Sequence, residues 1–581
     1  MDPTNVNTAL ASAFVEELSR GGVRHAVVSP GSRSTPLAVA LWRQPEIEVS
    51  VILDERSAAF FALGAAQASR APVAMLCTSG TAAANFHPAI CEADESAVPL
   101  IALSADRPPE LRGIGAGQTI DQIKLFGSSV RWFCEVGTHE ADDDGLLHLR
   151  SVACRALAAA KGEPRPGPVH LNLAWREPLA PIAVEGAVTA TDPLALDGRG
   201  ERPLTAVTAI DLEPSQFLLE EVAGHIGNAN SGVIVAGRQL DPELREPLAH
   251  LARAAGFPIL AEPTSQLRCG PHDRSHVITT YDQLLRDESF RKAVKPDLVL
   301  RFGEMPTSKP LRAWLAASGA DEIVVDPVGG WNEPTNRAAA ILRADPTELA
   351  AGWATRLEGE ARSAPQAWLD AEQAARSAIE AALGQEGQIT EPALHLALGR
   401  AHTEGDLVYT ASSMPIRDKE AFLPNEPTDV HFLCNRGANG IDGLLSSGIG
   451  AAHASGRPTT IVSGDLGFLH DLGGLAALRE VSTPVRIVVI NNDGGGIFGF
   501  LPQAEALGES EYEALLGTPR GVNVAKAADL FGLSYFEVNS LATLPGALAL
   551  GTGLIEVKVD RQANVDLHRH LSAAVATALA S

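Results

Sequence analysis

The sequence lacks any apolar stretch long enough for a membrane-spanning helix, and its start, MDPTNVNTAL, lacks the basic and apolar segments of a signal peptide. Cysteine is scarce. The six cysteines form no C-x-x-C pair and no zinc-like spacing, so we expect buried thiols in a reducing compartment. Positive charge is also scarce, with 46 Lys and Arg against 71 Asp and Glu and a net charge of −25. Nucleic acids and anionic membranes attract basic surfaces, so we expect neither as a partner. The scattered thiols and the start without a signal peptide place the protein in the cytoplasm.

What the sequence does contain is the composition of a globular protein, 45% hydrophobic and 20% charged, over 581 residues. A chain of this length is too long for one hydrophobic core, which favours three domains of ordinary size. Short apolar or β-branched runs alternate with alanine-rich helical patterns, and such alternation predicts parallel sheets covered by helices. The predicted fold class is therefore α/β, with three consecutive doubly wound parallel-sheet domains. We place these domains at residues 1–195, 206–355 and 386–581.

Two glycine-rich stretches near the C-terminal end follow predicted strands: TTIVSGD ends at Asp465, and VRIVVINN ends at Asn492. We expect one helix, roughly 472–481, to join the two strands. The residues after the second strand, DGGGIFGF, satisfy G-x-G-x-x-G, but a dinucleotide site is a poor interpretation. Ile497 and Phe498 are bulky where a helix should open over a pyrophosphate, and no acidic residue closes a second strand about twenty residues later.

The alternative is a metal site that uses both stretches. Parallel strands joined by a crossover end at the same edge of their sheet, which would bring Asp465 and Asn492 together. A carboxylate, an amide oxygen and the main-chain carbonyl of Gly494 suit Mg²⁺, which takes its remaining ligands from water or phosphate. Glycine N–H groups would meet that phosphate. Taken singly, Asp465 as a helix cap and Asn492 as a turn residue are the simpler interpretation.

The G-D pair, followed by N-N after an apolar strand, resembles the thiamine diphosphate motif of the pyruvate-decarboxylase-like superfamily. The resemblance implies pyrimidine-binding, central and diphosphate-binding domains in that order, with thiamine diphosphate and Mg²⁺ as cofactors and Mn²⁺ as an alternative ion. It also implies a glutamate in the first domain that shares a proton with ring nitrogen N1′ of the cofactor, and Glu55 in SVILDERSAAFF fits that place. Without the C-terminal motif, Glu55 is more simply a first-turn acid, with Asp54 as the helix cap.

Longer motifs narrow the resemblance, chiefly VSPGSRSTPLAVAL (28–41), SADRPPELRGIGAGQTIDQ (104–122), NRGANGIDGLLSSGIG (435–450) and NNDGGGIFGFLPQ (491–503). They resemble the 2-succinyl-5-enolpyruvyl-6-hydroxy-3-cyclohexene-1-carboxylate synthases of menaquinone biosynthesis, densely in the first and third domains and thinly in the middle one. The resemblance implies decarboxylation of 2-oxoglutarate and 1,4-addition of the resulting succinyl-semialdehyde carbanion to isochorismate. Both substrates are dicarboxylates, which suits guanidinium groups.

The resemblance also assigns site residues, motif by motif. On the substrate side they are Ser32, Arg33, Gln118, Lys309, Ser413, Arg417 and Arg436. On the cofactor side they are Glu55, Ile441, Gly464, Asp465, Leu466, Asn492, Gly494, Gly495, Ile497 and Phe498, with Asp465, Asn492 and the Gly494 carbonyl as metal ligands. Ile441 would be an apolar wedge that bends the cofactor, and Ile497 and Phe498 would wall the pocket. Outside these motifs, each arginine is more simply a surface or ion-pair residue, and Ile441 a core residue.

The superfamily resemblance further implies that Glu55 and Asp465 reach one cofactor from different subunits, so we expect a homodimer or a dimer of dimers. A second interpretation is another thiamine diphosphate enzyme, acetolactate-synthase-like or a 2-oxoacid decarboxylase, that prefers pyruvate. A third is a non-catalytic cofactor-binding subunit. The presence of Glu55 together with Asp465 and Asn492 argues against the third.

Overall fold

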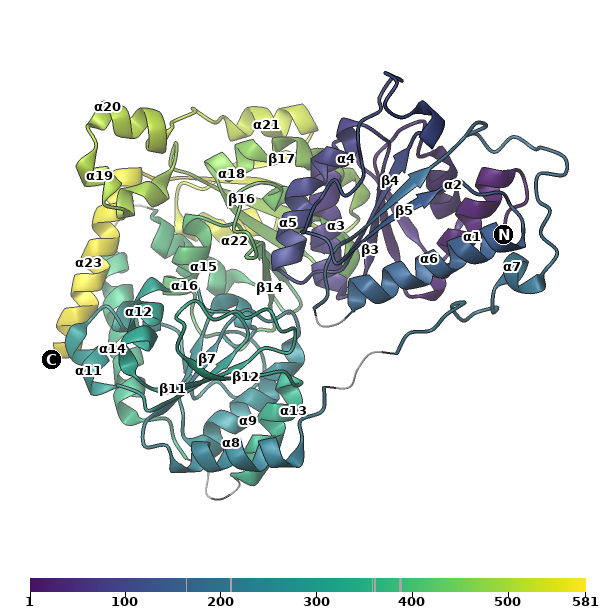
Figure 1. Ribbon diagram of the computed structural model, residues 1–581. Coiled ribbons are helices and arrows are strands. Elements are labelled where there is room, and N and C mark those ends of the chain that lie inside the picture. The colour runs from purple at the N-terminus through teal and green to yellow at the C-terminus, as the bar shows by residue number, and fades with distance from the viewer. Residues whose placement is uncertain (163–164, 209–211, 358, 360–361, 386–388, 581) are drawn as a thin grey trace. The chain divides into compact units, whose positions relative to one another are not determined.

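The computed structural model describes residues 1–162, 165–208, 212–357, 359, 362–385 and 389–580 (Figure 1). These residues form three parallel six-stranded sheets, in the strand orders β2-β1-β3-β4-β6-β5, β12-β11-β10-β7-β8-β9 and β14-β13-β15-β16-β18-β17. The predicted α/β class with three parallel sheets is thereby confirmed. No helix among the described residues is both long and apolar enough to cross a membrane.

Contacts divide the chain into two compact units. The first comprises Met1–Ile210, Asn435–Gly456 and His470–Thr483, and the second comprises Asp211–Cys434, Arg457–Leu469 and Pro484–Ser581. The first unit holds one sheet and the second holds the other two. Each of these units contains segments that lie far apart in the sequence, so the division does not test the three predicted domain ranges, which remain predictions. The predicted start of the third domain, residue 386, lies outside the described residues.

The sheet of the first unit has nearly continuous apolar strands, as expected when both faces of a parallel sheet are covered. Its central strands β3 (Val73–Cys77) and β4 (Leu100–Asp106) are buried at every residue. Around them lie β1 (His25–Val28), β2 (Glu48–Val51), β5 (Trp132–Gly137) and β6 (Val169–Ala174).

The prediction that all six cysteines are buried is corrected at two positions. Cys134 on the edge strand β5 and Cys91 on α5 (His87–Glu95) are only half-buried. The other four cysteines are buried.

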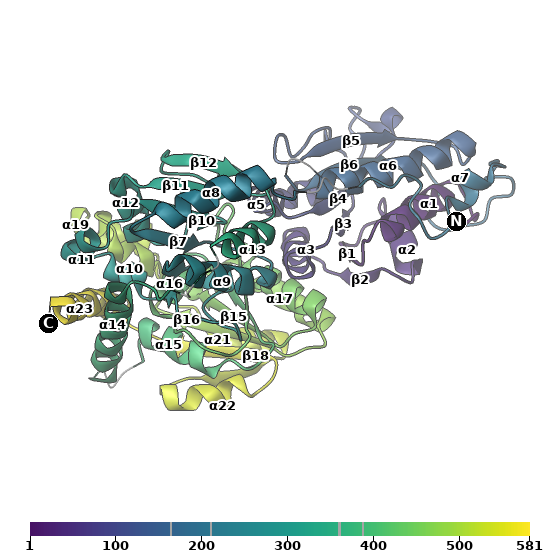
Figure 2. The same ribbon diagram turned by 90° about the horizontal axis from the view of Figure 1, so that it is seen from below.

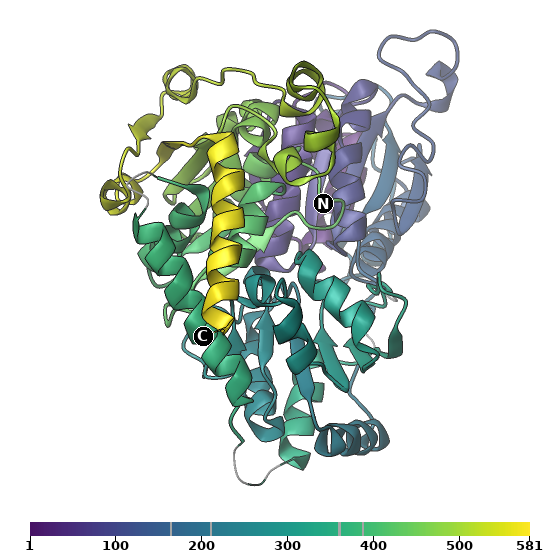
Figure 3. The same cartoon turned by 90° about the vertical axis from the view of Figure 1, so that its left-hand side faces the viewer.

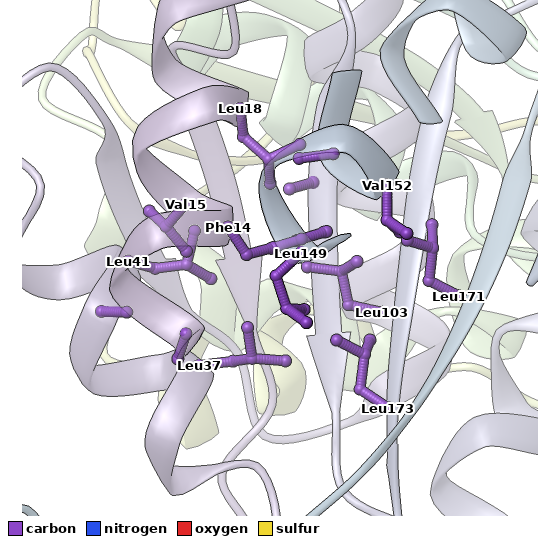
Figure 4. Packing of buried hydrophobic residues seen from close by; sticks show 14 of the residues in the cluster. Phe14, Val15, Leu18, Leu37, Leu41, Leu103, Leu149, Val152, Leu171 and Leu173 are labelled. Carbon is purple, nitrogen blue, oxygen red and sulfur yellow. The ribbon is translucent and has the colours of Figure 1, made fainter. Parts of the chain in front are cut away.

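Helices cover both faces of this sheet: α1 (Val6–Arg20), α2 (Thr35–Arg43) and α6 (Asp143–Lys161) lie on one face, and α3 (Glu55–Ser69) lies on the other (Figure 2). Figure 4 shows the packing on the first face, where Leu149 of α6 lies beside Phe14 of α1 and Leu103 of β4. Leu41 of α2 lies beside Val15 of α1, and Leu171 of β6 lies beside Val152 of α6. Each fully buried side chain of this kind contributes roughly 1.5–3 kcal/mol to folding. This layer holds in place the sheet whose carboxyl edge carries candidate site residues.

Helix α17 (Leu444–Ser455) comes from a distant part of the chain and packs directly on α3 within the first unit. Two glycines allow the helix backbones to touch. A methyl group at Gly64 would overlap the main-chain carbonyl of Ser447, and one at Gly450 would overlap that of Phe61. The contact thus fixes α17 against the helix that begins at Glu55.

We expect Gly64→Ala to destabilise the protein by roughly 1–3 kcal/mol, because the added methyl group forces two helix backbones apart. Gly224→Ala is the matched control: Gly224 lies in α8 (Gln216–Asn228), and nothing lies within 4 Å of its methyl position. Alanine there should stabilise by about 0.4–1 kcal/mol, because it lowers the entropy of the unfolded chain. Urea unfolding measures both changes. A Gly64→Ala variant as stable as the wild type would contradict the tight packing of α3 on α17.

The second unit contains the other two sheets. The strands of one are β7 (Gly232–Ala236), β8 (Ile259–Ala261), β9 (Val277–Ile278), β10 (Leu298–Phe302), β11 (Asp321–Val325) and β12 (Ala338–Leu342). Its two faces are covered by α8, α9 (Arg245–Ala255) and α13 (Pro346–Arg356), and by α10 (Tyr281–Leu284), α12 (Lys309–Ser318) and α14 (Gln366–Gln385). The long C-terminal helix α23 (Arg561–Ala580) packs along α14 (Figure 3).

The last sheet consists of β13 (Leu407–Thr410), β14 (His431–Cys434), β15 (Thr459–Gly464), β16 (Val485–Asn491), β17 (Ser534–Glu537) and β18 (Gly553–Lys558). Strands β15 and β16 are parallel and end at the same edge of the sheet, as predicted. They are direct neighbours, with Gly464 opposite Ile490. The segment between them differs from the prediction of one helix at 472–481. Helix α18 (Asp465–His470) starts at the end of β15, and the 3-10 helix η4 (Leu472–Glu480) follows it. Two consecutive glycines within η4, in the sequence LGGL, weaken α-helical propensity there.

Candidate active site

The carboxyl edge of the first unit's sheet carries Glu55, which opens α3 shortly after β2. The Asp54 carboxylate caps this helix by accepting a hydrogen bond from the Ser57 N–H at 3.0 Å. Glu55 is therefore not needed as the cap. It lies half-buried near Cys77 at the end of β3, and burial together with the Glu55 charge raises the pKa of the Cys77 thiol.

Two arginines lie close together at the same edge. Arg33 follows β1; its Nη1 donates to the Trp175 carbonyl at 2.8 Å, and its Nη2 lies 3.5 Å from the exposed Glu177 carboxylate. Arg107 follows β4 and donates to the Ser79 hydroxyl. Burial and the charge of Arg33 lower the pKa of Arg107, because the two guanidinium groups repel each other. A dicarboxylate bound between them would relieve this repulsion, so the pair suits such a ligand.

Gln118 is hydrogen-bonded to the loop after β3. Its side-chain Nε2 donates to the main-chain carbonyl of Ser79 at 3.1 Å, and the main-chain carbonyl of Gln118 accepts from the Ser79 hydroxyl at 3.0 Å. Its φ of 58° is a left-handed conformation, which costs about 1–3 kcal/mol outside glycine and is common at functional sites. Ser32 is exposed in the turn after β1. The sequence analysis missed Arg107, although it lies in a quoted motif and follows a strand end as the other candidates do.

The loop before α17 carries Arg436 and Ile441, both half-buried. The Glu92 carboxylate of α5 anchors this loop, since it accepts hydrogen bonds from the main-chain N–H groups of Gly437 and Ala438, each at 2.7 Å. These two bonds fix the loop to helix α5 of the first unit.

In the second unit, Asp465 directly follows β15, and its side chain is almost fully buried. Burial raises the pKa of its carboxyl to about 6. The carboxylate accepts a hydrogen bond from the Gly494 N–H, yet its Oδ2 has no partner among the described residues. A buried carboxylate oxygen without a partner is costly unless a cation neutralises it. Gly464 and Leu466 flank this carboxylate along the chain.

Asn492 follows the neighbouring strand β16, and Glu391 orients its amide. Asn492 Nδ2 donates to Glu391 Oε1 at 2.9 Å, whereas Asn492 Oδ1 has no partner within the described ranges. Two unpartnered oxygens at the ends of adjacent strands fit a hard cation such as Mg²⁺. The third predicted ligand, the Gly494 carbonyl, already accepts from the Gly496 N–H at 3.0 Å. Carbonyl oxygens have a second lone pair, so this bond leaves room for a metal.

An acidic pair lies behind the Asn492 amide. Burial and the neighbouring Asp418 carboxylate raise the pKa of Glu391, and burial raises the pKa of Asp418. His568 of α23 lies 3.0 Å from Asp418, and burial lowers its pKa to about 4. The acidic pair therefore keeps a proton at neutral pH, which limits the negative charge beside Asn492. The sequence analysis missed Glu391, because after Thr390 it has the appearance of an ordinary first-turn acid.

The glycines after β16 adopt conformations that a side chain would disturb. Gly494 has a φ of 141°, and a methyl group there would overlap the Gly517 carbonyl. The Gly495 N–H donates to that same carbonyl at 2.7 Å. Ile497 and Phe498 lie in the short 3-10 helix η5 (Gly496–Phe500), so no long helix opens here over a pyrophosphate. This agrees with the rejection of a dinucleotide site.

A cavity of about 600 Å³ in the second unit brings together three of the predicted residues. Lys309 at the start of α12, Arg417 of α16 (Met414–Phe422) and Ile497 line it, and Arg286 adds a third cation. Ser413 precedes α16 with a φ of 75°, and its carbonyl accepts from Arg417 Nη1 at 2.5 Å. Asp282, Asp418 and Glu420 line the cavity as well, and Asp282 is paired with Arg286 at 2.9 Å, so the lining carries charges of both signs. The cavity has the size to hold a small ligand.

Comparison with known proteins covers most of the chain. Residues 8–125 match the thiamine pyrophosphate enzyme N-terminal TPP binding domain, residues 218–409 the middle domain of thiamine pyrophosphate enzymes, and residues 421–554 the C-terminal TPP binding domain. The chain is 42% identical to the 2-succinyl-5-enolpyruvyl-6-hydroxy-3-cyclohexene-1-carboxylate synthase of Myxococcus xanthus (strain DK1622), over 99% of this chain and 98% of that protein. Proteins of the same name from Bacillus velezensis (41%; 98% and 97% covered) and Chloroflexus aurantiacus (42%; 99% and 97% covered) are similar to it as well.

Proposed function

Because the chain belongs to the family of 2-succinyl-5-enolpyruvyl-6-hydroxy-3-cyclohexene-1-carboxylate synthases, we propose that it decarboxylates 2-oxoglutarate and adds the resulting four-carbon unit to isochorismate in 1,4-fashion. It is a thiamine diphosphate enzyme that forms a C–C bond, with a place in menaquinone biosynthesis. One observation carries the proposal. Asp465 and Asn492 each present a buried oxygen without a described partner at the ends of neighbouring strands, where the family motif calls for a metal-bound diphosphate.

On the cofactor side, thiamine diphosphate supplies the electron sink for decarboxylation. Glu55 is assigned to share a proton with the cofactor's ring nitrogen N1′, and Ile441 to hold its bent conformation. Asp465, Asn492 and the Gly494 carbonyl are assigned to Mg²⁺, with Mn²⁺ as the alternative ion, because the ligand set consists of oxygens alone. The remaining assignments, to the diphosphate and the pocket wall, are Gly464, Leu466, Gly495, Ile497 and Phe498.

On the substrate side, cations must be gathered locally, because two dicarboxylates have to bind to a protein with a net charge of −25. In the first unit, Ser32, Arg33 and Gln118 are assigned to isochorismate, and Arg107 joins them because of its closeness to Arg33. Contacts to substrate are also assigned to Lys309, Ser413, Arg417 and Arg436.

A mass-spectrometric assay tests the proposal. The protein is incubated with thiamine diphosphate, Mg²⁺ and 2-oxoglutarate, with and without isochorismate. The expected result is CO₂ release and a new adduct that requires both substrates. If the protein ignores 2-oxoglutarate and consumes pyruvate instead, the cofactor assignment survives. The family's reaction would then be wrong for this chain, and each substrate-side residue would need reassignment.

We expect Arg107→Gln to raise the KM for isochorismate by about 10- to 100-fold, because a charged hydrogen bond contributes about 1.5–3 kcal/mol. The KM for 2-oxoglutarate should change little. Arg176→Gln is the matched control, since Arg176 is an exposed arginine of the same unit, paired with the exposed Glu110. Steady-state kinetics on both substrates decides the matter. A larger effect on 2-oxoglutarate than on isochorismate would place Arg107 at the other substrate.

We also assign the active form to a homodimer, or to a dimer of dimers, in which Glu55 of one protomer and Asp465 of its partner serve one cofactor. Apolar side chains around the candidate residues of the first unit support this. Leu53, two positions before Glu55, is 78% exposed, and Ile114, Ile120 and Ile123 are exposed around Gln118. Such surfaces are commonly covered by a partner. Sedimentation of the active protein should show a dimer or larger species, whereas an active species with the mass of one chain would refute the assignment.

A further inference from the structure

Three metal-ligating side chains meet at the amino edge of the first unit's sheet, the edge opposite Glu55 and Arg33. His25 is the first residue of β1, Glu48 is the first residue of β2, and His453 lies in the last turn of α17. One ligand atom from each residue lies within 4.8 Å of the other two. Glu48 contacts both histidines: its carboxylate oxygens lie 3.7 Å from His25 Nδ1 and 3.5 Å from His453 Nε2.

The hydrogen bonds around His453 show which of its nitrogens is available. Its Nδ1 lies 2.9 Å from the main-chain carbonyl of Glu480. A carbonyl only accepts, so Nδ1 carries the proton, and the lone pair of the neutral ring is on Nε2, the atom that faces Glu48. Donation of the other ring N–H to a backbone carbonyl is how proteins orient histidines that bind metals. The only described hydrogen-bond contact of Nε2 is to the Ser50 hydroxyl, at a long 3.4 Å.

His25 offers a second nitrogen in the same place. Its Nδ1 is buried and has no hydrogen-bond partner among the residues that the structure describes. A buried nitrogen without a partner carries a desolvation cost that a bound cation would remove.

The direct contacts of the Glu48 carboxylate with the two histidine nitrogens are long, and a metal ion bound between the three groups would interact with each of them more strongly. At 3.5 and 3.7 Å, the carboxylate is too far from either nitrogen for a good hydrogen bond. A metal at about 2.0–2.2 Å from each ligand atom, with the nitrogens and oxygen at the corners of a tetrahedron, fills that gap with small side-chain movements. The Glu48 side chain is 62% exposed, so water has access to the fourth corner.

We infer that His25, Glu48 and His453 form a binding site for one transition-metal ion of the zinc class, separate from the magnesium site proposed for the cofactor. Two imidazole nitrogens and one carboxylate favour Zn²⁺ over Mg²⁺, which prefers oxygen ligands alone. Bound metal would join the starts of β1 and β2 to α17, whose residues lie far along the chain. Such an ion stabilises the docking of α17, while its fourth position stays open to water.

The experiment uses the full chain saturated with thiamine diphosphate and excess Mg²⁺, so that the oxygen-ligand site is filled, and titrates Zn²⁺ by calorimetry. One Zn²⁺ per chain is expected, together with a rise in melting temperature. Glu48→Gln should weaken Zn²⁺ binding at least tenfold and remove the thermal shift. Because Glu48 is exposed, this variant should fold normally. Glu46→Gln, an exposed glutamate two positions earlier, should leave both unchanged.

A second measurement identifies the ligands. Co²⁺ in place of Zn²⁺ should give the visible absorption of a tetrahedral site with nitrogen ligands, and His25→Asn should abolish it. The inference is overturned if the wild type binds no Zn²⁺ under excess Mg²⁺, or if Glu48→Gln and Glu46→Gln bind it equally well. A Co²⁺ spectrum of octahedral oxygen ligation would also overturn it.

Discussion

Replacing Glu55 by glutamine is expected to lower kcat by about 10²- to 10⁴-fold while leaving the affinity for thiamine diphosphate nearly unchanged. Glutamine keeps the size of the side chain at the start of α3, and Asp54 continues to cap the helix. What is lost is the acidic proton that the carboxyl group shares with the cofactor's ring nitrogen. Calorimetric titration with thiamine diphosphate, together with single-turnover kinetics, separates binding from chemistry.

Glu95→Gln serves as the control for this experiment, because Glu95 is an exposed glutamate at the end of a neighbouring helix in the same unit. It should leave both turnover and cofactor affinity unchanged. Unaltered turnover in Glu55→Gln would refute the proton-sharing role. A large loss of cofactor affinity at normal turnover would instead make Glu55 a binding residue.

Replacing Asp465 by asparagine should weaken thiamine diphosphate binding in the presence of Mg²⁺ by more than about 100-fold, the upper range for loss of a group that only supports a metal ligand. The same change should not weaken the protein without cofactor. Burial raises the pKa of Asp465 to about 6, so the ionised carboxylate is unfavourable in the folded state. Asparagine removes that buried charge. Cofactor affinity and stability without cofactor should therefore respond differently.

The pH dependence gives this prediction a second readout. A carboxyl whose pKa is raised from 3.8 to about 6 on folding holds its proton more tightly in the folded state. Its contribution to stability is then greatest at low pH and is lost as pH rises from about 3.8 to 6. Chemical unfolding without cofactor should show a smaller loss in Asp465→Asn than in the wild type. Part of the loss stays, because burial also raises the pKa of the Asp471 carboxyl to about 6. Asp529→Asn, at an exposed aspartate of the same unit, should behave as the wild type in all three measurements. Normal Mg²⁺-dependent cofactor binding by Asp465→Asn would remove Asp465 from the metal site.

The sheets could be predicted because strands buried on both faces, such as VAMLC and LIALSAD, are continuous apolar runs. Two strands at sheet edges, β5 and β17, do not follow this pattern. Trp132–Gly137 and Ser534–Glu537 were not predicted, because they are only half-buried and their sequences are mixed. Their strand conformation depends on pairing with a distant neighbour, which no local pattern shows.

Candidate residues at strand ends could be predicted in the same way. Asp465 and Asn492 stand in a local motif, and parallel strands end at a common edge. Glu391 could not be predicted, because its role depends on a hydrogen bond to a residue 101 positions away. Arg107 lay within a quoted motif, but its importance comes from closeness to Arg33, which only the folded sheet reveals.

The contact of α3 with α17 has a consequence for the order of events during protein synthesis. The first unit is complete only when Asn435–Gly456 and His470–Thr483 have joined Met1–Ile210. While the ribosome makes the intervening residues, the face of α3 around Gly64 has no partner and stays open to water. Exposed apolar surface of this kind favours aggregation and recruits chaperones. A nascent chain, or a fragment that stops short of residue 435, is thus expected to need chaperone protection that the finished protein does not.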